Sequence, residues 1–113
     1  MIDRFAFGSM VIDGHSYRSD LIIFPDGRVQ DSWRRLQGHI LAKQDIATLV
    51  ESKPVMIIAG AGVNGRMRPE PELERFLFQK NIRFMIGPNS QAVAWYNNDC
   101  KDQNVGACFH LTC

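Results

Sequence analysis

The chain has 113 residues, of which 45% are hydrophobic and 22% charged, and its formal net charge is +1. This length fits one domain over residues 1–113 and excludes two full-size domains, and the composition excludes a wholly disordered chain. Because the net charge is close to zero, we expect no nucleic acid partner.

No targeting or membrane segment is evident in the sequence. The first residues, Met1–Phe5, lack the apolar core of a signal peptide. The sequence also lacks a run of about 18 apolar residues, the length that a membrane span needs. The three cysteines (Cys100, Cys108 and Cys113) are an odd number near the C-terminus, which is poor material for a disulfide framework. We therefore expect a cytoplasmic protein with free thiols and no membrane span.

The first third of the chain predicts antiparallel strands. Short apolar runs flank Asp13-Gly14, a dipeptide typical of tight hairpins because both positions tolerate a positive φ. The run Leu21–Phe24 is apolar throughout, which predicts a strand covered on both faces, and Pro25-Asp26-Gly27 then turns the chain. Residues Val29–Trp33 are expected to form a third strand, and Arg34–Lys43 a loop.

The rest of the chain alternates between helix and strand. We predict three helices: one that Gln44 or Asp45 caps and Lys53-Pro54 ends, one that Pro69–Glu72 opens and Asn81 stops, and one from Pro88 to Tyr96. The predicted strands between and after them are Val55–Ala59, Ile82–Ile86 and Val105–Leu111. Strands joined through helices imply right-handed crossovers and parallel pairing. The expected fold class is α/β: one three-layer domain with a mixed, partly parallel sheet, flanking helices and an N-terminal β-hairpin that extends or covers the sheet.

The segment Gly60–Gly65 carries glycines at its first, third and sixth positions, directly after a predicted strand. In a dinucleotide-binding turn the helix begins inside the glycine run, and an acidic residue about 20 positions later holds the ribose. Here the helix is expected only near Pro69, and no carboxylate follows the next strand. We interpret the glycines as a tight turn from strand to loop and expect no cofactor.

A small-molecule or anion site at the loop Gly60–Arg68 is the alternative that the sequence leaves open. Its arginines follow the glycines at the carboxyl end of a predicted strand, where open α/β sheets bind their ligands. Polar residues at the borders of other elements have side chains that can serve as an acid or a base in a pocket, although such residues more commonly form hydrogen bonds to the backbone of a loop. The candidate ligand-binding residues are Asp20, His39, Gly60, Gly62, Arg66 and Gln91.

The C-terminal segment Cys108–Cys113 also holds a histidine. Cys108 and His110 share one face of a strand, but Cys113 has the opposite parity and no second pair of ligands is close in sequence, so no metal is expected. A redox-sensing Cys113 with His110 as its base is a further hypothesis, beside a packed strand end with a free thiol. Nucleophile elbows and metalloprotease helices are absent from the sequence, and we assign no catalytic residue.

One short segment combines an aromatic ring with two cations. Trp33, Arg34 and Arg35 suit a surface that contacts a protein partner.

Several motifs occur in an order that resembles a known family. They are Tyr17 with Asp20, Pro25-Asp26-Gly27, Trp33, Gly38-His39, Ile57-Ile58 running into Gly60-x-Gly62, Gln91-Ala92-Val93 with Tyr96-Asn97, and Phe109-His110-Leu111-Thr112-Cys113. Together they resemble the small prokaryotic α/β proteins whose relatives include an adipogenesis-associated cytosolic protein and a mitochondrial assembly factor of respiratory complex I. This resemblance covers nearly the whole chain and implies a three-layer α/β fold with no agreed catalytic activity.

The sequence shows no complete group of catalytic residues. Together with the resemblance, this favours a non-enzymatic binding or assembly-factor-like domain that acts through a protein partner. The anion site at Gly60–Arg68, with or without a reaction, is the alternative.

Overall fold

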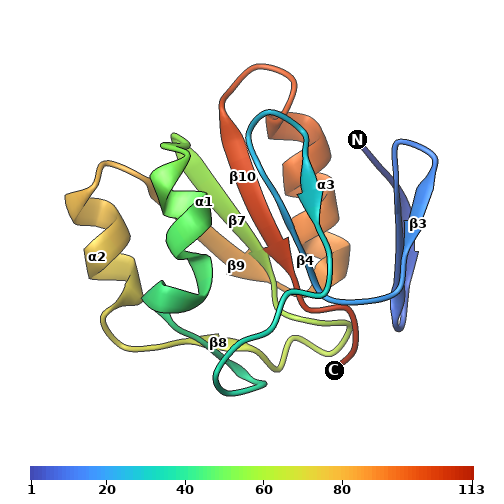
Figure 1. The fold of residues 1–113 in the computed structure, drawn as a ribbon, viewed down its shortest axis with the longest axis horizontal. Helices are drawn as coiled ribbons and strands as arrows, with labels where there is room; N and C mark the ends of the chain where they lie inside the picture. Colours follow the sequence, from blue (N-terminus) through green and yellow to red (C-terminus); the bar gives the residue numbers. More distant parts are fainter.

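Five strands form one mixed sheet in the computed structural model, which describes residues 1–113 (Figure 1). The strand order is β5-β4-β10-β7-β9. The strands are β4 (Leu21–Ile23), β5 (Val29–Gln30), β7 (Met56–Gly60), β9 (Arg83–Gly87) and β10 (Val105–Phe109). Strand β7 is parallel to both β9 and β10, whereas β4 is antiparallel to its neighbours. The predicted mixed sheet is therefore confirmed.

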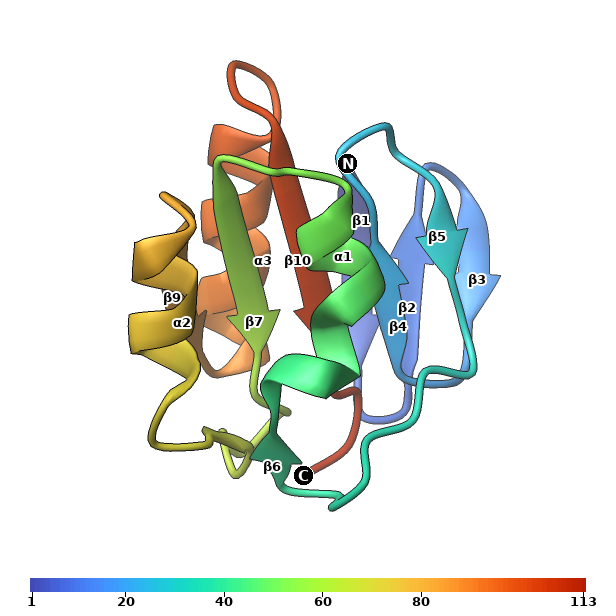
Figure 2. The ribbon, with the colours of Figure 1, turned by 60° about the vertical axis from the view of Figure 1, so that its left-hand side comes forward.

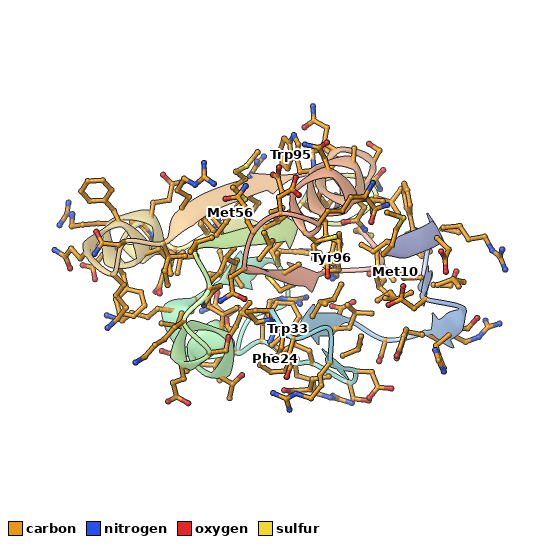
Figure 3. All side chains as sticks on the ribbon, turned by 90° about the horizontal axis from the view of Figure 1, so that it is seen from above. Met10, Phe24, Trp33, Met56, Trp95 and Tyr96 are labelled. Atoms are coloured by element: carbon orange, nitrogen blue, oxygen red, sulfur yellow. The ribbon has the colours of Figure 1, made fainter.

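Both faces of this sheet are covered. The helical elements are the 3-10 turn η1 (Lys43–Ile46), α1 (Ala47–Glu51), α2 (Leu73–Gln79) and α3 (Asn89–Asp99). Helices α1 and α2 lie on one face, and α3 lies on the other (Figures 1 and 2). Ile57 and Ile58 of β7 point into two different buried clusters, because successive side chains alternate across a strand. Trp33 belongs to the cluster under α1 and Tyr96 to the cluster under α3 (Figure 3).

The N-terminal strands form a separate antiparallel sheet. They are β1 (Ile2–Ala6), β2 (Ser9–Ile12) and β3 (His15–Tyr17). The turn between β2 and β3 holds Asp13 and Gly14 at φ values of 49° and 82°, as the dipeptide predicts. Asn97 of α3 binds both the N–H and the carbonyl of Ile2 at 2.8 Å, and Ile12 packs into the cluster under α3. The N-terminal strands thus cover the sheet beside α3 and do not extend it.

The predicted strand Val29–Trp33 is too long, since β5 ends at Gln30. Ser32 adopts a φ of 53°, and its N–H donates to Ser19 Oγ at 2.7 Å. This left-handed residue breaks the extended backbone and turns Trp33 into the core, where 5% of the residue is exposed.

The second helix begins later than the proline and the acidic residues predict. Residues Arg68–Pro69 form a short strand, β8, which pairs in parallel with β6 (Ile40–Leu41). Helix α2 therefore begins at Leu73 and not near Pro69. Long-range pairing overrides the local helix signal here.

The first helix also begins differently from its prediction. Neither Gln44 nor Asp45 occupies the cap position; Asp45 instead accepts the Ala42 N–H at 2.8 Å from inside a 3-10 turn. The stop at Asn81 is confirmed, with a φ of 60°, whereas the last strand ends at Phe109, earlier than predicted. No helix of the structure is both long and apolar enough to cross a membrane.

Candidate functional site

The three parallel strands of the sheet end side by side. Gly60 at the end of β7 is in register with Gly87 of β9 and with Phe109 of β10. The loop after β7 and the C-terminal residues consequently meet at one edge, which we call the carboxyl edge. Ligands of open α/β sheets usually bind at such an edge.

The buried side chain of Asn89 ties this edge together. Its Oδ1 accepts the Gly62 N–H at 3.1 Å, and its Nδ2 donates to the His110 carbonyl at 2.8 Å. The Val63 N–H also donates to the Thr112 carbonyl at 2.7 Å. Gly62 has a φ of 104°, and a Cβ there would overlap the backbone of Cys113. The glycines allow close backbone approach, and no helix begins within their run.

Asp20 lies at the centre of a charged cluster on the same edge. Its Oδ2 accepts hydrogen bonds from Arg35 Nη2 at 3.0 Å and from His110 Nδ1 at 2.8 Å, and its Oδ1 accepts the Leu111 N–H at 2.8 Å. The Arg35 side chain is only 4% exposed and also donates to the Gly38 carbonyl from Nε and Nη2. Strand β4 places Asp20 here because Leu21 is in register with Phe109 of β10.

These contacts determine the charge state of Asp20. Burial by itself would raise the pKa of the carboxyl, but the hydrogen bonds from His110, Leu111 and Arg35 outweigh burial and lower the pKa. Asp20 is thus an ionised carboxylate with both oxygens engaged. The arrangement stabilises the edge, and both oxygens of Asp20 already accept hydrogen bonds from the protein.

The six candidate ligand-binding residues do not line one cavity. His39 is exposed, and its ring lies edge-on to His110 with 5.5 Å between centroids, so it is close to Asp20. Gln91 is exposed on the first turn of α3. Arg66 is exposed as well, and its backbone N–H donates to the Cys113 carbonyl at 3.2 Å. Gly60 ends strand β7, where a Cβ would overlap the side chains of Phe109 and Asn89.

A small groove lies beside this loop. It has a volume of about 280 Å³, and among its lining residues are Asn64, Arg68, Gly87 and Gln91. The exposed Arg68 forms no ion pair within the protein. Of the six candidates only Gln91 lines this groove.

The segment Trp33, Arg34 and Arg35 does not form an exposed patch. The Trp33 indole is buried and donates from Nε1 to the Asp45 carbonyl at 2.8 Å. The Arg35 guanidinium stacks on the Trp33 ring, 4.7 Å from its centroid, and is buried as well. Only Arg34 is exposed, because the left-handed Ser32 turns its neighbours inward.

All three cysteines are free, as predicted. Burial raises the pKa of the Cys108 thiol to about 12, which keeps it protonated at neutral pH. Cys113 is half-buried, and its redox role stays a prediction.

The sequence did not reveal a second feature, the open edge of β9. This strand pairs with β7 on one side only. The Arg83 N–H donates to the Val55 carbonyl, and the Gly87 carbonyl accepts the Ala61 N–H, so alternate residues of β9 face β7. The backbone N–H and carbonyl groups of Phe84 and Ile86 therefore face away from the sheet.

A groove with a volume of about 790 Å³ lies between α2 and the first part of β9. Helix α2 contributes Glu74, Arg75 and Phe78, and β9 contributes Phe84 and Met85. Phe78 is 79% exposed. In the sequence, Phe78 directly follows Leu77, a residue on the buried face of α2, and this spacing could have indicated an exposed ring. The local pattern does not reveal which strand lies at the edge of a sheet.

Comparisons with known proteins agree with this fold. A family described as "Protein of unknown function (DUF498/DUF598)" matches residues 2–110. The conserved hypothetical protein PH1505 from Pyrococcus horikoshii OT3 is 21% identical, with a TM-score of 0.88 over 100% of this chain and 99% of that chain. The protein MT938 is 30% identical, with a TM-score of 0.83 over 100% and 98% of the two chains.

A third solved structure bears on the expected location. It is described as an outer membrane protein from Bartonella henselae and is 23% identical, with a TM-score of 0.80 over 98% of this chain and 93% of that chain. No curated protein matches the sequence. The fold is therefore shared, whereas the cytoplasmic location stays a prediction.

Proposed function

This chain belongs to the DUF498/DUF598 family of proteins of unknown function, and we propose that it is a protein-binding domain that receives an extended segment of a partner along β9. The observation that carries the proposal is the open β9 edge, where Phe84 and Ile86 direct unpaired backbone groups outward. This proposal agrees with the assembly-factor-like role that the resemblance implies, and it places the partner contact at β9, since Trp33 and the Arg35 side chain are buried.

Strand addition supplies both affinity and selectivity at such an edge. The outward backbone groups of Phe84 and Ile86 provide hydrogen bonds to any extended chain, and neighbouring side chains select its sequence. Edge strands are usually protected by lysine, proline or a bulge. The centre of β9, Phe84-Met85-Ile86, has no such protection, and the exposed phenyl ring of Phe78 lines the groove beside it.

Selection from a random peptide library, followed by amide mapping, tests this function. In dilute protein, bound peptides should slow hydrogen exchange at the Phe84 and Ile86 amides, whereas the Met85 amide, which faces β7, is already protected without a peptide. Phe78→Ser should weaken peptide binding about tenfold because it removes an apolar anchor. Leu36→Ser is the matched control, since Leu36 is 76% exposed and outside the groove. Peptides that bind without protecting Phe84 and Ile86 would contradict the proposal.

A second candidate function is the binding of a small anion in the groove at the carboxyl edge. The unpaired Arg68 and the first turn of α3, which has no side-chain cap, favour negative charge there.

Thermal unfolding with inorganic phosphate or citrate tests the anion site. A ligand present at 100 times its dissociation constant should add about 2.7 kcal/mol of stability. Arg68→Ala should abolish the shift, whereas Arg66→Ala should leave it unchanged because Arg66 does not line the groove. If the wild-type protein shows no shift with either anion, this candidate is rejected.

A further inference from the structure

We infer that the segment received by β9 is β9 of a second copy of this chain, so that two central sheets join edge to edge across a two-fold axis. The inference rests on the proposed function of the β9 edge and names its partner. A two-fold interface must be self-complementary, because each surface meets a copy of itself. The sequence and register of β9 meet this requirement.

The outward backbone groups of β9 are symmetric about Met85. With Met85 on the axis and the strands antiparallel, Phe84 lies opposite Ile86 of the other copy, and Ile86 lies opposite the other Phe84. Both are residues whose N–H and carbonyl groups face outward. Each opposed pair therefore exchanges two backbone hydrogen bonds.

Neighbouring registers satisfy fewer backbone groups. Centring the axis on Ile86 would place Phe84 opposite Pro88, which has no N–H to donate. Centring it on Phe84 would place Ile86 opposite Ile82, which lies outside the strand. The register centred on Met85 is the one that keeps both outward residues inside paired strands.

The side chains of β9 also suit self-pairing. Phe84 would lie opposite Ile86, and a cross-strand pair of an aromatic and a β-branched residue stabilises antiparallel strands. Arg83 lies opposite Gly87, so no like charges meet on the paired strands. The other edge strand, β5, has only two residues and offers no comparable surface.

The groove beside β9 extends the same interface. A two-fold axis perpendicular to the sheet keeps α2 of both copies on one face, so the two α2 helices approach each other near the axis. Phe78, 79% exposed in the single chain, would then be shielded by the other copy. The same groove is lined by Glu74, Arg75 and Arg83, so each copy has both acidic and basic groups to offer the other.

Sedimentation and light scattering over a range of concentrations test this inference. The wild-type protein should be a dimer that dissociates on dilution. Met85→Lys and Met85→Glu each place like charges on the axis and should each weaken dimerisation about tenfold or more. An equal mixture of the two variants should form the heterodimer, seen by native mass spectrometry, because the charges across the axis are then opposite.

A second pair of variants covers the case in which Met85 substitutions impair folding. Phe78→Lys and Phe78→Glu alter an exposed residue of the same interface. Each variant alone should dimerise more weakly, and an equal mixture of the two should form the heterodimer. A wild-type protein that stays monomeric at every concentration, or single variants that still form full dimers, would overturn the inference. A monomer whose Phe84 and Ile86 amides are protected by selected peptides would overturn self-pairing and leave the proposed function intact.

Discussion

Replacing Asp20 with asparagine is expected to lower the free energy of unfolding by about 3 kcal/mol, because it leaves the buried Arg35 without its counter-charge. The Arg35 side chain is 4% exposed and that of Asp20 18%, so solvent replaces little of the lost interaction. The hydrogen bonds that His110 and the Leu111 N–H donate to this side chain also become weaker, because a neutral amide replaces the carboxylate. Urea unfolding measures the difference.

Asp26→Asn is the matched control for this variant. The Asp26 carboxylate pairs with Arg28 on the surface, where both side chains are well exposed. Exposed pairs contribute little to stability, so the control should unfold like the wild type. An Asp20→Asn protein as stable as this control would show that the cluster does not stabilise the carboxyl edge.

The same cluster predicts how stability depends on pH. The pKa of Asp20 is lower in the folded protein than in the unfolded chain, so its contribution is present above the unfolded pKa and is lost as pH falls through the folded value. The stability gap between wild type and Asp20→Asn should therefore narrow as the pH falls below about 4. Urea unfolding of both proteins along an acid series checks this, and a constant gap would contradict it.

Gly62→Ala is also expected to lower the free energy of unfolding by about 3 kcal/mol, through backbone strain and steric overlap together. The φ of 104° is strained for any L side chain, and the new Cβ would overlap the Cys113 backbone, which cannot move aside as a flexible side chain can. The overlap would also disturb the hydrogen bond between the Gly62 N–H and Asn89.

Two other glycines separate these effects. Gly8 has a φ of 81° with open space around it, so Gly8→Ala reports strain alone, at about 1 kcal/mol. Gly38 has neither a positive φ nor a neighbour within 4 Å, so Gly38→Ala should stay within about 0.5 kcal/mol of wild type. Thermal or urea unfolding of the three variants gives the comparison. Equal losses for Gly62→Ala and Gly8→Ala would show that the close approach of the C-terminus adds nothing.

The two edges of the sheet differ in how their polar groups are paired. The carboxyl edge is held closed by Asp20, Asn89 and the C-terminal residues, whose polar groups bind one another. The β9 edge is left open, with outward backbone groups and an exposed phenyl ring beside them. Hydrogen-bonded polar groups stabilise a fold, whereas the unpaired backbone groups of an edge strand offer hydrogen bonds to another strand.

The sequence by itself determined the features that depend on nearby residues. Asp13-Gly14 and Asn81 adopt positive φ where the sequence predicts a turn and a helix stop, and the apolar run of β4 indicated a strand covered on both faces. Such features follow from the conformational limits of single residues and from the alternation of side chains along a strand.

Only the tertiary structure decided how distant segments meet. The register of β4 with β10 brings Asp20 to His110, pairing with β6 draws Pro69 out of the predicted helix, and the strand order leaves β9 at the edge. Strand order and register depend on contacts between residues far apart in the chain, which local propensity and periodicity do not encode. The α/β class could therefore be predicted from the sequence, but neither the charged cluster nor the open edge could be.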